Sequence, residues 1–170
     1  MQTILGRNVN ALDRVVVSVT QIHTGSAMNI VPETAMLNGT VRYYDTDAQA
    51  TVKSRMAEIV EFQARSFGCT AELDYEDGYP PTINHPEQAA FAAEVAREVV
   101  GAEMVDEDTP PIMPGEDFSY MLQARPGAYL FLGQGDTPIC HHPKYDFNDR
   151  IAPIGASFFA RLVERALPIG

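Results

Sequence analysis

Two adjacent imidazoles stand in a loop-forming stretch near the end of the chain. Residues 140–149 read CHHPKYDFND, so His141 and His142 are followed by a proline turn and by acidic and aromatic residues. Imidazole is a good ligand for zinc, manganese, cobalt or nickel when a neighbouring group orients its second ring nitrogen. The stretch therefore indicates a metal-binding loop. The alternative is that both histidines are ordinary residues of a surface loop.

A glycine turn lies upstream of this loop. Residues 113–119 read MPGEDFS, in which Gly115 precedes two carboxylates at the expected start of a helix. Carboxylates in the first helical turn commonly act as caps favoured by the helix dipole, and we assign Glu116 and Asp117 to that role. The backbone at Gly115 differs, because a glycine lets a ligand approach closely and free N–H groups at a helix start can hold an anion.

An amide and a guanidinium form a third candidate pair. Asn29 and Arg42 are thirteen residues apart, in a predicted loop and in the strand that follows it. We expect this arrangement to bring both groups to one surface, where a guanidinium suits bidentate capture of a carboxylate. The alternative is a turn-forming asparagine and an exposed strand arginine.

The first half of the chain supplies the elements that position Asn29 and Arg42. Strands are expected over residues 14–22 and 34–44, followed by a helix that Asp45 begins and Gly68 ends, and a third strand over residues 70–75. The order strand, strand, helix, strand is most of a ferredoxin-like split βαβ sandwich whose first strand is absent.

The second half positions the glycine turn and the histidines. Helical spacing begins at Pro86 and stops at Gly101, a short helix follows the glycine turn, and a last helix begins near Pro153. The continuous apolar run over residues 128–133 predicts a strand covered on both faces. These elements are too few for an independent α/β domain, so the predicted fold class is α/β with two incomplete parts, residues 1–80 and 81–170.

Composition excludes several classes of protein. The chain has 170 residues, a net charge of −11 and 45% apolar residues, which allow a real core. Because no cluster of lysine or arginine is present to neutralise phosphates, we expect no nucleic acid or membrane partner. Its apolar runs are shorter than a membrane span, the N-terminus lacks signal-peptide features, and two cysteines suit a reducing compartment. We therefore predict a cytoplasmic protein.

These motifs, followed by Ile154, Gly155 and Ala156 at the head of the closing helix, resemble a known family along essentially the whole chain. The chain is similar to the C-terminal part of hippurate hydrolases and N-acyl-amino-acid amidohydrolases, metallopeptidase relatives of aminoacylase and carboxypeptidase G that include indole-acetyl-amino-acid hydrolases. The resemblance implies a partial lid or dimerisation domain over residues 1–80 and the C-terminal portion of a metallohydrolase catalytic domain over residues 81–170.

The same resemblance implies the role of each site residue. His141 matches the family's metal ligand, Asn29 the lid residue that contacts the substrate, Arg42 the lid residue that supports carboxylate binding in the site of the partner subunit, and Gly115 the turn at the substrate's carboxylate end. It also implies two divalent ions in each intact site (Zn, Mn, Co or Ni), an N-acyl amino acid substrate, and a homodimer formed through the lid.

We therefore expect a fragment of a metal-dependent amidohydrolase that hydrolyses hippurate-like amides. The resemblance implies that the other metal ligands and the glutamate general base belong to a segment outside residues 1–170. The chain is thus expected to hold no catalytic residue and to be inactive alone. One alternative is a non-catalytic dimerisation or binding module that retains the carboxylate-recognition surface. Another is a metal carrier that uses Cys140, His141 and His142.

Overall fold

The computed structural model describes residues 1–168 and divides the chain into two compact units. The first unit contains residues 1–81 together with residues 113–115, and the second contains residues 82–112 and the chain from residue 116 onward. The predicted mixture of helices and strands is confirmed. Among the described residues, no helix combines the length and the apolar character needed to cross a membrane.

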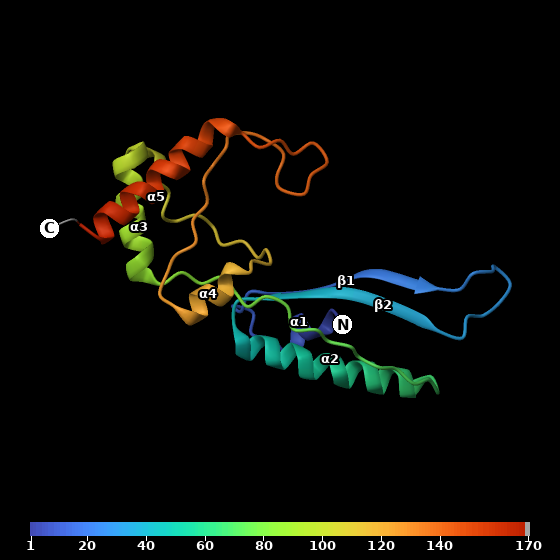
Figure 1. The fold of residues 1–170 in the computed structure, drawn as a ribbon. Coiled ribbons are helices and arrows are strands. Elements are labelled where there is room, and N and C mark those ends of the chain that lie inside the picture. Colours follow the sequence, from blue (N-terminus) through green and yellow to red (C-terminus); the bar gives the residue numbers. More distant parts are fainter. Residues whose placement is uncertain (169–170) are drawn as a thin grey trace. The chain divides into compact units, whose positions relative to one another are not determined.

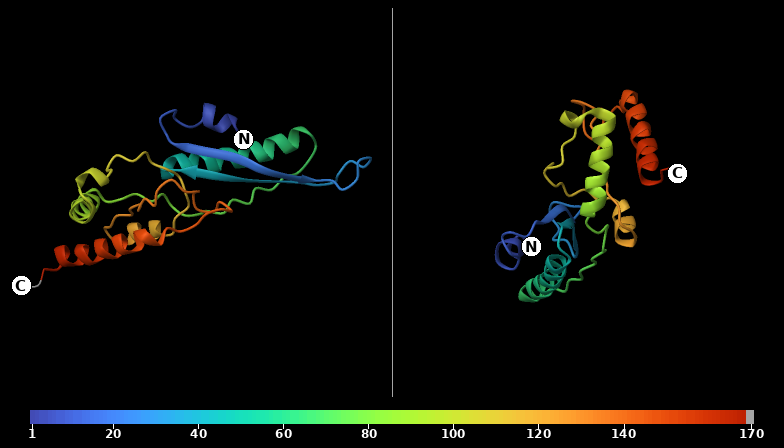
Figure 2. Two further views of the ribbon diagram at one scale, coloured as in Figure 1. Left: turned by 90° about the horizontal axis from the view of Figure 1, so that it is seen from above. Right: turned by 90° about the vertical axis from the view of Figure 1, so that its left-hand side faces the viewer.

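A long hairpin and one helix make up most of the first unit. Strands β1 (Val15–Thr24) and β2 (Ala35–Tyr43) pair in antiparallel fashion, and helices α1 (Thr3–Arg7) and α2 (Thr46–Ser66) accompany them. Helix α2 lies along one face of the hairpin (Figure 1, Figure 2). The register shifts after Val19, where a Cβ on Gly39 would lie 2.4 Å from the Ser18 carbonyl oxygen. The close approach of the strands at this bulge therefore requires glycine.

The core of the first unit lies between α2 and the hairpin. Ile4, Val17 and Val52 are buried there, and seven partly buried apolar residues pack around them. Because side chains alternate along a strand, Val17 and its partner Val41 face the core, and Arg42 belongs to the opposite face of the sheet. The hydrophobic pattern thus fixes the direction of the candidate carboxylate-binding arginine.

Helix α2 begins and ends as the sequence predicts. The Asp45 carboxylate accepts the backbone N–H groups of Asp47 at 2.6 Å and Ala48 at 3.2 Å, and Gly68 takes a positive φ of 68° just after the helix. The predicted strand over residues 70–75 is wrong, because this segment forms no backbone ladder with β1 or β2. Side chains hold the chain after α2 instead, since Asp77 accepts from Lys53 at 2.8 Å and from Gln49 at 2.9 Å.

The second unit contains short helices and long connections. Its helices are α3 (Pro86–Val100), η1 (Ala102–Met104), α4 (Phe118–Ala124), η2 (Asp149–Ile151) and α5 (Ala152–Ala166). Helices α3 and α5 lie side by side (Figure 1) and are joined by ion pairs of the side chains Glu94, Glu98, Arg161 and Arg165. The helices that the sequence predicts are confirmed.

The predicted strand over residues 128–133 is wrong. Its backbone pairs with a side chain rather than with another strand. The Tyr129 N–H donates to Asn84 Oδ1 at 2.7 Å, and Asn84 Nδ2 donates to the Tyr129 carbonyl at 2.9 Å. One amide side chain thus satisfies both backbone groups of Tyr129, as a strand neighbour would.

Candidate functional site

The loop of residues 135–147 carries the two adjacent histidines. His141 has a φ of +71°, the only positive φ of a non-glycine residue in the described chain. This left-handed conformation is disfavoured for a residue with a Cβ, and such residues concentrate at functional positions. The side chain of His141 is exposed, so its ring is accessible to a ligand.

His142 has a different role, because its ring, carbonyl and N–H groups form hydrogen bonds that stabilise the turn of residues 139–145. Its Nδ1 accepts the backbone N–H of Lys144 at 3.0 Å, and its carbonyl accepts the N–H of Tyr145 at 2.9 Å. Its own N–H donates to the Ile139 carbonyl at 3.1 Å. One ring nitrogen of His142 is therefore already occupied inside the protein.

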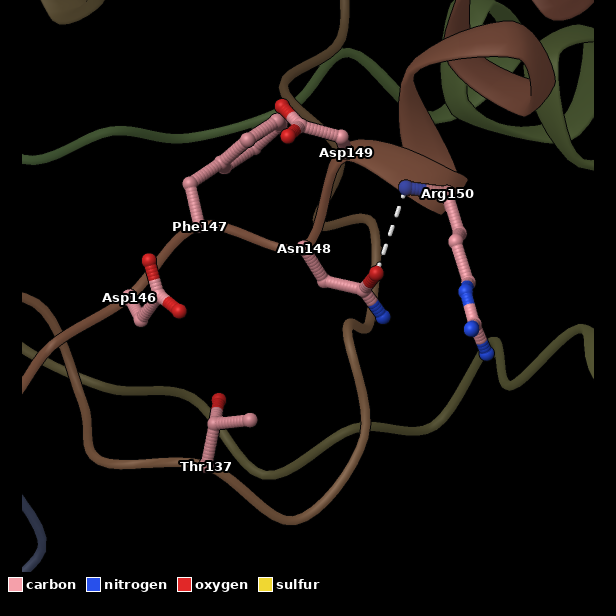
Figure 3. A pocket seen from close by; sticks show the side chains of 6 residues that line it. All are labelled: Thr137, Asp146, Phe147, Asn148, Asp149 and Arg150. Carbon is pink, nitrogen blue, oxygen red and sulfur yellow. Dashed lines mark hydrogen bonds between the residues drawn. The ribbon is translucent and has the colours of Figure 1, made fainter.

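A hollow lies at the base of this loop (Figure 3). It is lined by Thr137, Asp146, Phe147, Asn148, Asp149 and Arg150. The Asn148 side chain accepts the backbone N–H of Arg150 at 3.2 Å and so begins helix η2.

Tyr145 lies in the same loop. Loss of hydration raises the pKa of its hydroxyl, and Cys140 raises it further.

Glu116 joins the start of α4 to the segment around Tyr129. Its carboxylate accepts the Phe118 N–H at 3.2 Å and the Tyr129 hydroxyl at 2.9 Å. These bonds, the Phe118 N–H first, lower the pKa of Glu116, and the bond to Glu116 raises the pKa of Tyr129. The predicted capping role is thus confirmed for Glu116, whose lowered pKa keeps it ionised at neutral pH. Asp117 makes no side-chain cap bond.

Two predicted substrate-binding residues lie together in the first unit. A Cβ on Gly115 would stand 3.3 Å from Arg42 Nη1 and 3.0 Å from Cδ2 of Tyr79. Glycine at this position leaves the guanidinium close to the backbone, whereas a Cβ would require the Arg42 and Tyr79 side chains to move by a few tenths of an ångström. The sequence analysis missed Tyr79, which lies in an otherwise ordinary turn after Gly78.

Asn29 is not part of this cluster. It is exposed in the loop beyond the far end of the hairpin, where Thr24 pairs with Ala35. Arg42 follows Ala35 by seven residues, which is about 23 Å at roughly 3.3 Å for each strand residue. The expectation that Asn29 and Arg42 share one surface is therefore not met within a single chain.

The metal-ligating side chains of the described chain are not clustered. No group of three or more histidine, cysteine, aspartate or glutamate residues among residues 1–168 is arranged to hold an ion. A catalytic site needs at least three protein ligands. His141 is exposed and belongs to no such group among the described residues.

Comparison with known proteins identifies the family. The family described as Peptidase family M20/M25/M40 matches residues 6–165, which is nearly the whole chain. The chain belongs to this family. A solved structure from Bacillus subtilis, described as a dinuclear metal binding peptidase from the M20 family, superimposes with a TM-score of 0.75 at 28% identity. The match covers 90% of this chain and 42% of that one.

Curated relatives of this M20 chain carry the names of deacetylases and hydrolases. An N-acetyldiaminopimelate deacetylase from Streptococcus sanguinis is 32% identical over 165 residues, which is 96% of this chain and 43% of the relative. An N-acetyl-L-cysteine deacetylase from Bacillus subtilis is 33% identical over 94% of this chain and 37% of its own length. A hippurate hydrolase from Campylobacter jejuni is 29% identical over 98% and 44%. The chain thus spans about two fifths of the length of these relatives.

Proposed function

We propose that this chain is part of a metal-dependent amidohydrolase that cleaves the amide bond of N-acyl amino acids. The observation that carries the proposal is the close approach of the Arg42 guanidinium to the Gly115 backbone. All N-acyl amino acids share an α-carboxylate, and a guanidinium beside an open backbone suits that group. The names of the relatives, deacetylases of acetylated amino acids and a hippurate hydrolase, describe substrates of this class.

The proposal gives this chain binding and positioning roles. Arg42 and Gly115 receive the substrate carboxylate, and His141 provides one metal donor. A divalent ion in such a hydrolase activates water and polarises the carbonyl. Because the described residues provide only this donor, no step of the hydrolysis is assigned to them, and the remaining ligands and the general base belong to a further segment of the enzyme.

The hairpin also supports self-association, which we include in the proposal. Both strands expose large apolar side chains, namely Val16, Val19, Ile22, Met36 and Leu37. A two-stranded sheet is marginal alone, and each unpaired edge is a template for another strand. A homodimer formed through the hairpin would cover this surface and would allow Asn29 and Arg42 of one chain to serve different sites.

One observation favours a second candidate, a non-catalytic binding module. The described residues hold no cluster of metal ligands. Assay of this chain alone with hippurate and excess Mn²⁺ or Zn²⁺ should give no glycine under either candidate. Turnover would contradict the inference that the remaining metal ligands and the general base belong to a further segment. The two candidates separate when the chain is fused behind the N-terminal catalytic segment of a family member. Turnover by this joined enzyme supports the hydrolase.

The metal role is tested in the joined enzyme by paired histidine variants. His141→Ala should remove metal affinity and lower kcat by orders of magnitude, because it deletes a donor to the ion that activates water. His142→Ser should be much milder, since a serine hydroxyl can accept the Lys144 N–H in place of Nδ1. Equal metal content in wild type and His141→Ala, measured after dialysis against a chelator, would remove His141 from the site.

The carboxylate role is tested by Arg42→Ala in the same enzyme. Metal content should stay unchanged, and transition-state binding should weaken by about 2–5 kcal/mol, the range for breaking a buried charged pair. Mixing Arg42→Ala with His141→Ala should restore activity if Arg42 reaches the site of the partner subunit. No recovery, with subunit exchange confirmed by mass spectrometry, would place the action of Arg42 within its own subunit.

A further inference from the structure

The loop of residues 135–147 is closed at its base by Gln134 and Asn148, which are fourteen residues apart. Gln134 Oε1 accepts the backbone N–H of Asn148 at 3.1 Å, and Asn148 Nδ2 donates to the Gln134 carbonyl at 3.3 Å. Each residue therefore gives a side-chain group to the backbone of the other. Both residues are half-buried, which limits the competition from water for these bonds.

The Gln134 side chain also reaches both arms of the loop. Its Nε2 donates to Thr137 Oγ1 at 2.8 Å on the first arm and to the Asp146 carbonyl at 3.4 Å on the second. It interacts with the Tyr145 hydroxyl as well. Three of these partners, Thr137, Asp146 and Asn148, line the hollow at the base of the loop (Figure 3).

The tip of the loop depends on a closed base. Backbone hydrogen bonds in the tip close local turns, from His142 N to the Ile139 carbonyl and from Tyr145 N to the His142 carbonyl. Between them His141 holds a φ of +71°. A non-glycine residue keeps such a conformation only where the surrounding structure imposes it, and joining the loop ends reduces the conformations open to the tip.

We propose that Gln134 is a positioning residue. Its amide closes the base of the 135–147 loop and thereby holds His141 in the left-handed conformation that presents its ring as a metal donor. The metal part of this statement rests on the proposed function, whereas the effect of Gln134 on the loop does not. A carboxamide is needed because the site uses an acceptor for Asn148 and donors for Thr137 and Asp146.

The test uses the 170-residue chain without metal and reads the loop directly. Amide exchange of residues 142, 145 and 148, and the NMR Cα and Cβ shifts of His141, are compared between wild type, Gln134→Ala and Gln134→Glu. Gln134→Ala should speed exchange in the loop by about tenfold or more and move the His141 shifts toward averaged values, since it removes several hydrogen bonds at once. Gln134→Glu, which keeps the acceptor and loses the donors, should lie between the two.

Matched variants separate this role from general destabilisation. Gln123→Ala removes the same side chain from an exposed position of α4 and should leave the loop unchanged. Asn148→Asp removes the donor to the Gln134 carbonyl and keeps the acceptor for the Arg150 N–H, so it should give a smaller change of the same sign if Gln134→Ala fails to fold. Amides of α3 and α5 should exchange at wild-type rates in every variant.

His141 shifts and loop exchange that stay at wild-type values in Gln134→Ala would overturn the inference. So would loss of protection in α3 and α5 to the same extent as in the loop, for Gln134→Ala and Asn148→Asp alike. These outcomes differ from failure of the proposed function. In that case His141→Ala would leave the metal content of the joined enzyme unchanged, while the exchange rates and chemical shifts of the loop would keep their expected values.

Discussion

The two units of this M20 chain hold their candidate site residues by different means. In the first unit, Ile4, Val17 and Val52 form a buried apolar cluster, and the alternation of the strand above it determines the face on which Arg42 lies. In the second unit, His141 depends on hydrogen bonds among loop residues, and α3 is joined to α5 by charged side chains. Packing thus determines the face on which Arg42 lies, whereas the proposed support of His141 comes from polar contacts.

Exposed apolar side chains occur in the second unit as well as on the hairpin of the first. The second unit leaves Phe131, Leu132, Phe159 and Val163 exposed, together with part of the apolar run that the sequence predicted to be covered. A domain of this size ordinarily buries such side chains. This exposure agrees with a chain that spans about two fifths of its relatives, whose additional segment would provide a cover in the proposed enzyme.

The largest expected effect is in the core of the first unit. Val52→Ala removes two methyl groups from a fully buried position and should destabilise this unit by about 2–4 kcal/mol through lost burial and an unfilled cavity. Val163→Ala on the exposed face of α5, where the side chain is 57% exposed, should change stability by less than about 0.5 kcal/mol. Amide exchange resolved to α2 and to α5 measures both. Equal losses of stability in Val52→Ala and Val163→Ala would contradict the view that the first unit is held by its buried core and that the exposed face of α5 contributes little.

The same contrast explains which elements the sequence predicted. The helices were predictable because their signals are local, such as the Asp45 cap of α2 and Gly101, which follows α3 with a φ of +91°. The two strands that were predicted wrongly depend on non-local contacts, since a strand needs a neighbour with which to form a ladder. Residues 70–75 and 128–133 have strand composition, but neither segment pairs with a neighbouring strand, and in the second segment the Asn84 side chain bonds both backbone groups of Tyr129.

The candidate site was partly predictable for a similar reason. His141 and Gly115 stand in short motifs, so the sequence alone is enough to select them as candidates. The distance between Asn29 and Arg42 follows from the register of the hairpin. The sequence shows only that the two residues are thirteen positions apart, and this spacing does not define the register. The roles of Gln134 and His142 are visible only in three dimensions, because each depends on which backbone N–H its side chain accepts.

A smaller effect of opposite sign is expected in α5. Gly155→Ala should stabilise the second unit by about 0.5–1 kcal/mol, because alanine loses less backbone entropy than glycine in a helix. The added Cβ would stand 3.5 Å from Leu132 Cδ2, which is an ordinary van der Waals contact. Thermal unfolding of the variant should show a higher midpoint. A lower midpoint would show that Leu132 packs against α5 too tightly to accept a methyl group.

The smallest expected effect belongs to the ion pairs between α3 and α5. Arg161 and Arg165 donate to Glu98, and the hydrogen bond from Arg161 is the main cause of a lowered pKa of Glu98 in the folded chain. A carboxylate with a lowered folded-state pKa stabilises the fold above its unfolded-state value, near 4.5, and this contribution is lost as the pH falls through the folded-state pKa. Glu98→Gln should therefore lower the unfolding midpoint slightly at neutral pH, and the difference from wild type should vanish at acid pH.

Salt separates this ion-pair effect from a packing effect of the same substitution. Because the side chains are partly exposed, ~1 M NaCl screens their attraction over a few ångströms and should remove most of the difference between wild type and Glu98→Gln at neutral pH. Val52→Ala should keep its full effect under the same conditions, since apolar burial does not depend on charge screening. A Glu98→Gln difference that survives both acid and salt would mean that α3 and α5 are joined by packing, as the first unit is.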